Sequence, residues 1–173
     1  MRSRRFSGRI VQLACTLAGI ASVAFAALVT PSYRLLYNPT DSAPRGLYML
    51  IPSSNLAVDA FALVHLPAAP ARLAHERHYL PLTVPILKRV AARSGQRVCE
   101  RHGAVEIDEQ LVAHARLRDG VGRPLEPWNG CQMLEESEFF LLSRGSTASF
   151  DSRYFGPIHS DAVIGRAIPL WTW

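Results

Sequence analysis

Residues 84–92 read Val84-Pro85-Ile86-Leu87-Lys88-Arg89-Val90-Ala91-Ala92, an apolar run that predicts a buried β-strand. Lys88 is the only lysine among 19 basic residues, since all the others are arginines. An arginine keeps its proton in a protein, whereas a lysine removed from water can release its proton and act as a base. Lys88 is therefore a candidate general base. The alternative is a residual surface lysine beside a solvated Arg89.

Short apolar segments between Gly, Pro, Asn and Asp turn signals continue on both sides of this run. The pattern predicts strands over residues 46–51, 60–66, 86–92, 96–100, 104–107, 110–115, 138–143 and 162–168. A short helix is expected over residues 71–79, a hairpin turn at Asp108-Glu109, and a long loop over residues 119–130. The predicted class is mainly β, either a partly open barrel or a pair of packed antiparallel sheets.

The N-terminal part has a different composition. Residues 10–30 carry no charged side chain, and as a helix they would span about 31 Å, close to the thickness of a bilayer's hydrocarbon core. The preceding arginines predict, by the positive-inside rule, a cytoplasmic basic tail over residues 1–9 and a single-pass transmembrane anchor over residues 10–30. These arginines are Arg2, Arg4, Arg5 and Arg9.

Residues 31–173 would then form one domain outside the bacterial inner membrane, in the periplasm. A cleaved signal peptide is the alternative for the N-terminal segment, because Ala24-Phe25-Ala26 offers a small-x-small cleavage site. Both alternatives place residues 31–173 in the same compartment.

The net charge of +5 arises almost entirely before this domain. Removing the four N-terminal arginines from the 19 basic residues leaves 15, against 14 acidic residues. The domain is therefore nearly neutral. A nucleic-acid-binding protein needs a clustered basic face, so we expect no nucleic-acid partner.

Of the three cysteines, Cys15 lies in the apolar N-terminal segment, and Cys99 and Cys131 lie in the exported part. Disulfides persist in the periplasm, so we predict a Cys99–Cys131 bond, worth about 3–4 kcal/mol on the loop-entropy model. Two separate buried thiols are the alternative. The sequence contains no CxxC or HExxH spacing, and we predict no metal and no cofactor.

Two further segments carry candidate chemistry. Ser42 lies in a loop in which Pro39, Pro44 and Gly46 restrict the backbone before a strand, so Ser42 is a candidate nucleophile. Taken alone, this segment favours the alternative of a simple turn serine. Residues 149–156 read Ser149-Phe150-Asp151-Ser152-Arg153-Tyr154-Phe155-Gly156, where Asp151 and Arg153 could form a local ion pair. The six histidines are scattered, and without a Gly-x-Ser-x-Gly motif they do not support a Ser-His-Asp site.

The order of Ser42, Lys88 and the Asp151–Gly156 box resembles the type I signal peptidases, and most closely the TraF-like proteases of bacterial conjugation. The resemblance covers nearly the whole chain, through the ending at residues 164–171. Cys99 and residues 128–131 are similar to the conjugation branch in particular. Residues 142–145 read Leu-Ser-Arg-Gly instead of the Gly-Asp-Asn-Arg of housekeeping signal peptidases, which favours the specialised branch.

The resemblance implies that Ser42 is the nucleophile and Lys88 its general base. A neutral lysine near pH 7.5 requires a pKa about 3 units below the free value, which burial among apolar neighbours can supply. Supporting roles are implied for Thr40, in the oxyanion hole, and for Ser149, which would orient the lysine amine. Asp151 and Arg153 match an ion pair beside the site, although the aspartate could act more directly in this branch.

The resemblance further implies a membrane-anchored periplasmic serine endopeptidase that cleaves an exported precursor after a small residue. Its substrate would be the pilin of a conjugative type IV secretion system, with the inner membrane and other transfer-apparatus proteins as further partners. Joining of the pilin ends after cleavage is an additional hypothesis. The alternatives are a general signal peptidase and a non-catalytic assembly protein of the secretion apparatus.

Overall fold

The computed structural model describes residues 3–28 and 34–173. The chain divides into two units, Met1–Ser32 and Tyr33–Trp173. The first unit contains the helix α1 (Ser3–Leu28). Within the described residues, no helix combines the length and the hydropathy that a membrane span requires. The transmembrane helix predicted over residues 10–30 is therefore not confirmed, and residues 29 and 30 lie outside the described part.

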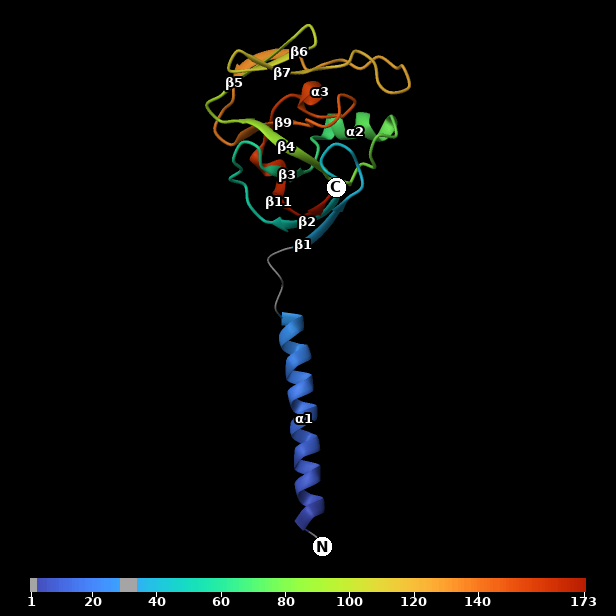
Figure 1. Cartoon of the computed structure of the whole chain (residues 1–173), viewed down its shortest axis with the longest axis vertical. Helices are drawn as coiled ribbons and strands as arrows, with labels where there is room; N and C mark the ends of the chain where they lie inside the picture. Colours follow the sequence, from blue (N-terminus) through green and yellow to red (C-terminus); the bar gives the residue numbers. More distant parts are fainter. Residues whose placement is uncertain (1–2, 29–33) are drawn as a thin grey trace. The chain divides into compact units, whose positions relative to one another are not determined.

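The second unit consists of two antiparallel sheets, seen one above the other in Figure 1. The larger sheet has the order β1-β2-β11-β3-β4-β9-β10. Its strands are β1 (Arg34–Asn38), β2 (Gly46–Ile51), β11 (Val163–Thr172), β3 (Phe61–Val64), β4 (Ile86–Arg93), β9 (Glu138–Leu142) and β10 (Ile158–His159). The smaller sheet has the order β7-β6-β5-β8, with β7 (Gln110–His114), β6 (Ala104–Ile107), β5 (Arg97–Arg101) and β8 (Gly130–Met133).

Three short helices complete this unit: α2 (Ala68–Glu76), α3 (Ser152–Phe155) and the 3₁₀ turn η1 (Ser160–Ala162). The prediction of a mainly β protein with paired antiparallel sheets is confirmed, and the predicted strands and the helix are present with shifted ends. The sequence pattern missed β1, β8 and β10. These are short strands at sheet edges with few buried residues, so they lack the apolar alternation that reveals a half-buried strand.

β11 extends four residues beyond its predicted end at Ile168, through Pro169. A proline removes a donor from a strand ladder and is tolerated only where a strand lacks one neighbour or is irregular. β11 pairs with β3 only up to Ala167, so Pro169 has β2 as its one neighbouring strand, and a register shift follows between Pro169 and Trp171. The strand can therefore continue to Thr172.

β4 is an inner strand of the larger sheet, and Lys88 lies just before its pairing with β9 begins. Lys88 lies opposite Ala62 of β3, and the pairing of β4 with β9 begins one residue later, at Arg89. Successive side chains alternate between the two faces of a strand. Lys88 is 4% exposed, whereas Arg89 is half-buried, and its guanidinium lies 4.3 Å above the ring centroid of Phe61. Arg89 is thus partly exposed and partly covered by an aromatic ring.

The smaller sheet contains Cys99 and Cys131. Cys99 of β5 and Cys131 of β8 are direct partners in the antiparallel register, and the structure joins them by a disulfide. The predicted pairing is present, and it fastens the end of the long loop that connects β7 and β8.

Gly46 at the start of β2 occupies a backbone conformation that other residues rarely adopt, with φ of 139°. A Cβ at this position would also collide with the backbone carbonyl oxygen of Trp171 on β11. We expect Gly46→Ala to lower the free energy of unfolding by about 2 kcal/mol or more, measured by urea denaturation. Gly120→Ala is the matched control, since a Cβ there meets no atom within 4 Å and should cost less than about 0.5 kcal/mol. Equal effects of the two substitutions would contradict this prediction.

Candidate active site

The loop between β1 and β2 carries Ser42, and the buried side chain of Asn38 organises it. The Asn38 Nδ2 group donates to the carbonyl oxygens of Thr40, Ala43 and Pro44 at 3.0–3.1 Å. The Asn38 Oδ1 atom accepts from the Thr40 backbone N–H and hydroxyl. The Tyr48 hydroxyl donates to the Pro44 carbonyl from the other side, at 2.6 Å. Asn38 was not among the predicted site residues, although an asparagine directly before Pro-Thr is a typical turn-forming signal.

Ser42 contacts two segments that are distant in the sequence. Its Oγ atom lies 2.9 Å from the Thr40 Oγ1 atom and 3.4 Å from the carbonyl oxygen of Leu87, the residue before Lys88. Its own carbonyl oxygen accepts a 2.7 Å hydrogen bond from the Ser143 hydroxyl. Ser42 is thus fixed both at its backbone and at its side chain.

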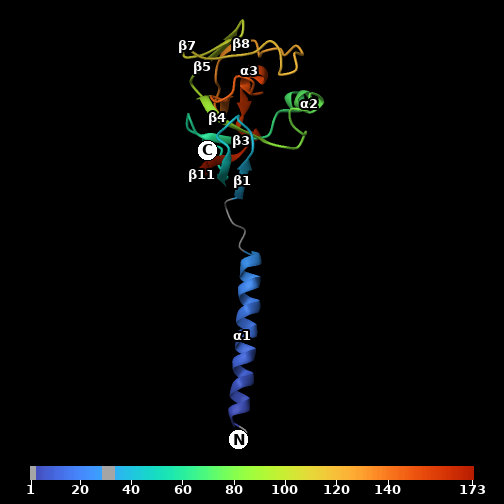
Figure 2. The ribbon, with the colours of Figure 1, turned by 45° about the vertical axis from the view of Figure 1, so that its right-hand side comes forward.

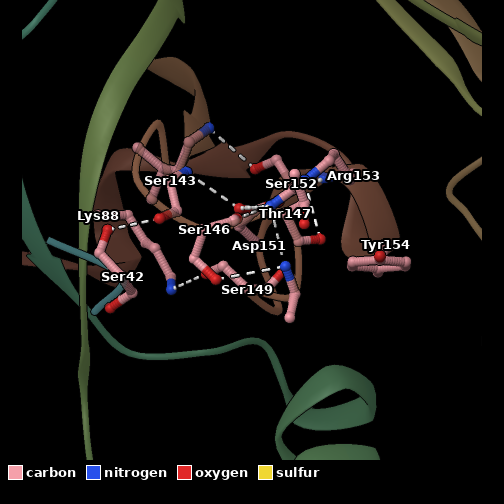
Figure 3. A network of polar contacts seen from close by, with 12 residues as sticks. Ser42, Lys88, Ser143, Ser146, Thr147, Ser149, Asp151, Ser152, Arg153 and Tyr154 are labelled. Carbon is pink, nitrogen blue, oxygen red and sulfur yellow. Dashed lines mark hydrogen bonds and ion pairs between the residues drawn. The ribbon is translucent and has the colours of Figure 1, made fainter. Parts of the chain in front are cut away.

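The Lys88 amine points toward Ser149, as Figure 3 shows, and donates to the Ser149 Oγ atom at 2.5 Å. Burial lowers the pKa of Lys88 from 10.5 to about 8; the charge of Asp151 opposes this effect, and the charge of Arg153 adds to it. A minority of the Lys88 amines is therefore neutral near pH 7, many more than for a lysine in water. The burial and the lowered pKa expected from the apolar strand are both present.

The structure brings Ser42, Thr40, Lys88 and Ser149 to one cleft. Among the side-chain hydrogen bonds of the described residues, none joins the Ser42 Oγ atom to the Lys88 Nζ atom. Hydrogen bonds between catalytic groups are often long without substrate and shorten when it binds. The arrangement is therefore compatible with proton transfer from Ser42 to Lys88 in a substrate complex.

Asp151 and Arg153 form an ion pair beneath this cleft, and both side chains are buried. The Arg153 Nε and Nη2 groups donate to the two Asp151 carboxylate oxygens at 2.8 and 2.7 Å. Asp151 also accepts from the backbone N–H groups of Arg153 and Ser143. Its hydrogen bonds thus go to Arg153 and Ser143, and Lys88 takes Ser149 as its partner.

The Arg153 guanidinium holds the segment that presents Ser149. Its Nη1 and Nη2 groups donate, at 3.0–3.3 Å, to four backbone carbonyl oxygens, those of His114, Ser146, Thr147 and Ser149. Five donors in a rigid plane suit arginine for this task and not lysine. Arg153 therefore positions the Ser149 hydroxyl, and through it the Lys88 amine.

Ser143 connects the ion pair to the Ser42 loop and was missed by the sequence analysis. Its backbone N–H donates to Asp151 at 3.0 Å, and its hydroxyl donates to the Ser42 carbonyl. Ser143 lies in the Leu-Ser-Arg-Gly segment, which the sequence marked only as a departure from housekeeping signal peptidases. A serine at the buried end of a strand gives no signal of this contact, because its partner is 101 residues away.

The cleft has a volume of about 450 Å³ and is lined mainly by apolar side chains. Ser42, Lys88 and Ser149 are among its polar lining groups. In the part of the chain that the structure describes, no group of three or more His, Cys, Asp or Glu side chains is arranged to hold a metal ion. The chemistry that this site offers is that of a hydroxyl beside a partly neutral amine.

The sequence matches the family described as "Signal peptidase, peptidase S26" over residues 7–172. The chain belongs to this signal peptidase family. This chain is 33% identical to "Probable conjugal transfer protein TraF" of Sinorhizobium fredii, over 100% of this chain and 95% of the relative. It is 32% identical to "Plasmid transfer protein TraF" of Escherichia coli, over 79% of this chain and 82% of the relative.

A third relative is "Conjugal transfer protein TraF" of Agrobacterium tumefaciens strain 15955, with 32% identity over 90% of this chain and 92% of the relative. Among solved structures, a signal peptidase I from Enterococcus faecalis V583 is similar, with 17% identity and a TM-score of 0.40 over 65% of this chain and 96% of that one. The family match over residues 7–172 confirms the predicted membership of the signal peptidase family.

Proposed function

We propose that this protein is a periplasmic serine endopeptidase in which Ser42 is the nucleophile and Lys88 the general base. The observation that carries the proposal is the buried Lys88 amine, whose pKa of about 8 leaves it partly neutral in the same apolar cleft as Ser42. A lysine that is desolvated in this way can accept the serine proton at neutral pH. Membership of a peptidase family supports the same assignment.

In the proposed mechanism, the Ser42 Oγ atom attacks the scissile carbonyl while the Lys88 Nζ atom takes its proton. The Ser42 backbone N–H would stabilise the developing oxyanion, and so would the Thr40 hydroxyl, 2.9 Å from the Ser42 Oγ atom, once its proton turns away from the Asn38 Oδ1 atom. Lys88 then returns the proton to the leaving amine, and an acyl-enzyme remains on Ser42. Water, or another nucleophile, then gives its proton to Lys88 and attacks the acyl-enzyme carbonyl. This attack releases the acyl group from the Ser42 Oγ atom.

An extended peptide fits beside this pair. In the described residues, Ile86, Leu87 and Lys88 pair with β3 on one side and with no strand on the other. A free strand edge can take up an extended segment through main-chain hydrogen bonds. The apolar lining of the cleft favours a substrate whose cleaved region is apolar.

We infer the class of substrate from the relatives, which are named as conjugal and plasmid transfer proteins. The proposed substrate is the precursor of the conjugative pilin, cut after a small residue close to the inner membrane, with residues 10–30 as anchor or signal segment. Attack on the acyl-enzyme by the N-terminus of the pilin, instead of by water, would join its ends.

The test is the intact mass of the cognate pilin, co-expressed with the wild type or with Ser42→Ala. We expect cleavage by the wild type alone. Hydrolysis gives the linear product, and ring closure gives a product lighter by one water. Identical processing by both proteins would refute the catalytic role and leave a scaffold role in the secretion apparatus. Rescue of cells that lack their own signal peptidase would instead indicate a general signal peptidase.

The pH dependence of cleavage follows from the pKa of Lys88. The folded pKa of about 8 means that the protonated, inactive form dominates below pH 8, and that about one-tenth of the amines are neutral at pH 7. We expect kcat/KM to rise with pH and to level off above about 8. A profile measured with a fluorogenic peptide checks this, and a flat profile from about pH 6 to 9 would exclude Lys88 as the titrating base.

A further inference from the structure

The cleft continues beyond Ser42 and Lys88 to a cluster of aromatic rings. Phe150 lies at the centre, with its ring centroid 5.7 Å from that of Tyr154, in a stacked arrangement, and 5.7 Å from that of Tyr79. All three side chains are half-buried and line the same cleft as Ser42. The half-buried Leu80 and the buried Leu125 line it as well. Part of this aromatic surface is therefore accessible to a bound molecule.

Asp119, in the loop between β7 and β8, holds one wall of the aromatic end, the part of the cleft that Tyr79, Phe150 and Tyr154 line. The Asp119 Oδ2 atom accepts from the Tyr79 hydroxyl at 2.7 Å and from the Arg123 Nε group at 2.6 Å. The Asp119 Oδ1 atom accepts from the backbone N–H groups of Val121 and Arg123. These bonds join the loop to the segment after α2, which lies beside the loop in Figures 1 and 2.

The carboxylate of Asp119 is 3% exposed, and both oxygens are already occupied. Burial alone would raise the pKa of Asp119, but the hydrogen bonds from Tyr79 and Arg123 outweigh it and lower the pKa. Asp119 thus stays ionised but offers no free acceptor to a cationic substrate. The exposed part of the aromatic rings remains available for binding, although the Arg123 guanidinium lies 5.7 Å from the Tyr79 ring centroid and the Arg153 guanidinium 6.0 Å from that of Tyr154.

We propose that Tyr79, Phe150 and Tyr154 form a subsite for a large apolar side chain of the substrate, away from the scissile bond, and that Asp119 is the positioning residue of its wall. Aromatic faces bind apolar and aromatic side chains favourably, and a continuous cleft connects them to the Ser42 nucleophile. The subsite rests on the proposed peptidase function, because its ligand is part of the cleaved peptide. It would restrict cleavage to precursors with a large apolar residue at one remote position.

The test uses the full chain in detergent and a positional-scanning set of internally quenched peptides. Each position on either side of the scissile bond carries Ala or Phe. At one position at least two residues from the cut, we expect the wild type to prefer Phe by about tenfold or more in kcat/KM. Asp119→Asn should reduce this preference to about twofold, by raising KM for the Phe peptide more than for the Ala peptide.

Tyr79→Phe keeps the aromatic ring and removes the donor to Asp119, so its preference should lie between those of the wild type and Asp119→Asn. Asp108→Asn is the matched control. The Asp108 carboxylate also accepts N–H groups, from Gln96 and Arg97, but it lies on an exposed hairpin outside the cleft. The control should keep the full preference for Phe.

Three outcomes separate the proposals. Ser42-dependent cleavage with no preference at any remote position overturns the subsite and leaves the peptidase intact. If Asp119→Asn loses kcat/KM equally for the Phe and the Ala peptide and has a lowered unfolding midpoint, the positioning role is overturned. If the wild type cleaves no peptide, the proposed function fails, and fluorescence anisotropy on Ser42→Ala still tests the subsite. Equal affinity for Phe and Ala peptides in that assay would then refute it.

Discussion

Lys88→Arg should lower kcat/KM by about 10²- to 10⁴-fold, the contribution typical of a general base. The substitution keeps a positive charge on β4 but removes the ability to accept a proton, since a guanidinium stays protonated in proteins. The measurement is the rate of precursor cleavage by purified protein. Processing at the wild-type rate would eliminate the Ser42–Lys88 pair as the catalytic centre.

Arg89→Lys provides the matched control, because it introduces a lysine on the next residue of the same strand. Arg89 lies over Phe61 and close to Asp59, not against Ser149. We expect this variant to cleave within about twofold of the wild type. A large loss in both variants would indicate damage to β4 and not the removal of a base.

Lys88→Met separates loss of the base from loss of the fold. The folded pKa of about 8 lies below the unfolded value of 10.5, so protonated Lys88 destabilises the protein below pH 8 by about 3 kcal/mol, and this cost disappears as pH rises from 8 to 10.5. We expect Lys88→Met to be inactive yet at least as stable as the wild type at pH 7. Activity without Lys88 would refute its role as the base.

Arg153→Met should lower the free energy of unfolding by about 3–5 kcal/mol, because it leaves the Asp151 carboxylate buried without a cation. It also removes the donors that hold the carbonyl oxygens of Ser146 and Ser149. The measurement is urea denaturation. The double variant Asp151→Asn with Arg153→Met should cost less than Arg153→Met alone, since no uncompensated charge remains.

Arg144→Met is the control for a surface pair. Arg144 lies 2.9 Å from Asp59, and both side chains are more than half exposed, so its loss should cost less than about 1 kcal/mol. Similar losses in the free energy of unfolding for Arg144→Met and Arg153→Met would show that burial does not make the Asp151–Arg153 pair more important for stability than a surface pair. A stable Arg153→Met protein that still loses cleavage would assign Arg153 to the positioning of Ser149 alone.

The sequence alone was sufficient for the class of fold, because its signals are local. Strands such as β2 and β6 have buried and exposed residues that alternate along the segment itself. Weaker elements escaped detection, since β1 and β8 are stabilised by the strands beside them and not by their own composition. The hairpin turn at Asp108-Glu109 was visible, and both residues indeed have positive φ.

The candidate site shows the same division. Lys88 could be singled out because a lone lysine in an apolar strand has few explanations, and the ordered motifs around Ser42 and Asp151 gave the family. Asn38, Ser143 and Asp119 could not be found in this way. Each acts through hydrogen bonds whose partners are set by the folded backbone, and two of these bonds cross 40 and 101 residues of sequence.

The sequence by itself determined most of the strands, the family, and the hydroxyl and amine available for chemistry, because composition and local order encode these properties. Only the tertiary structure decided that Ser143 joins the Asp151–Arg153 pair to the Ser42 loop, that Arg153 holds the segment presenting Ser149, and that an aromatic end extends the cleft. Burial and direction depend on which strands pair and how closely they pack. The pKa of Lys88 is therefore a property of the fold and not of the residue.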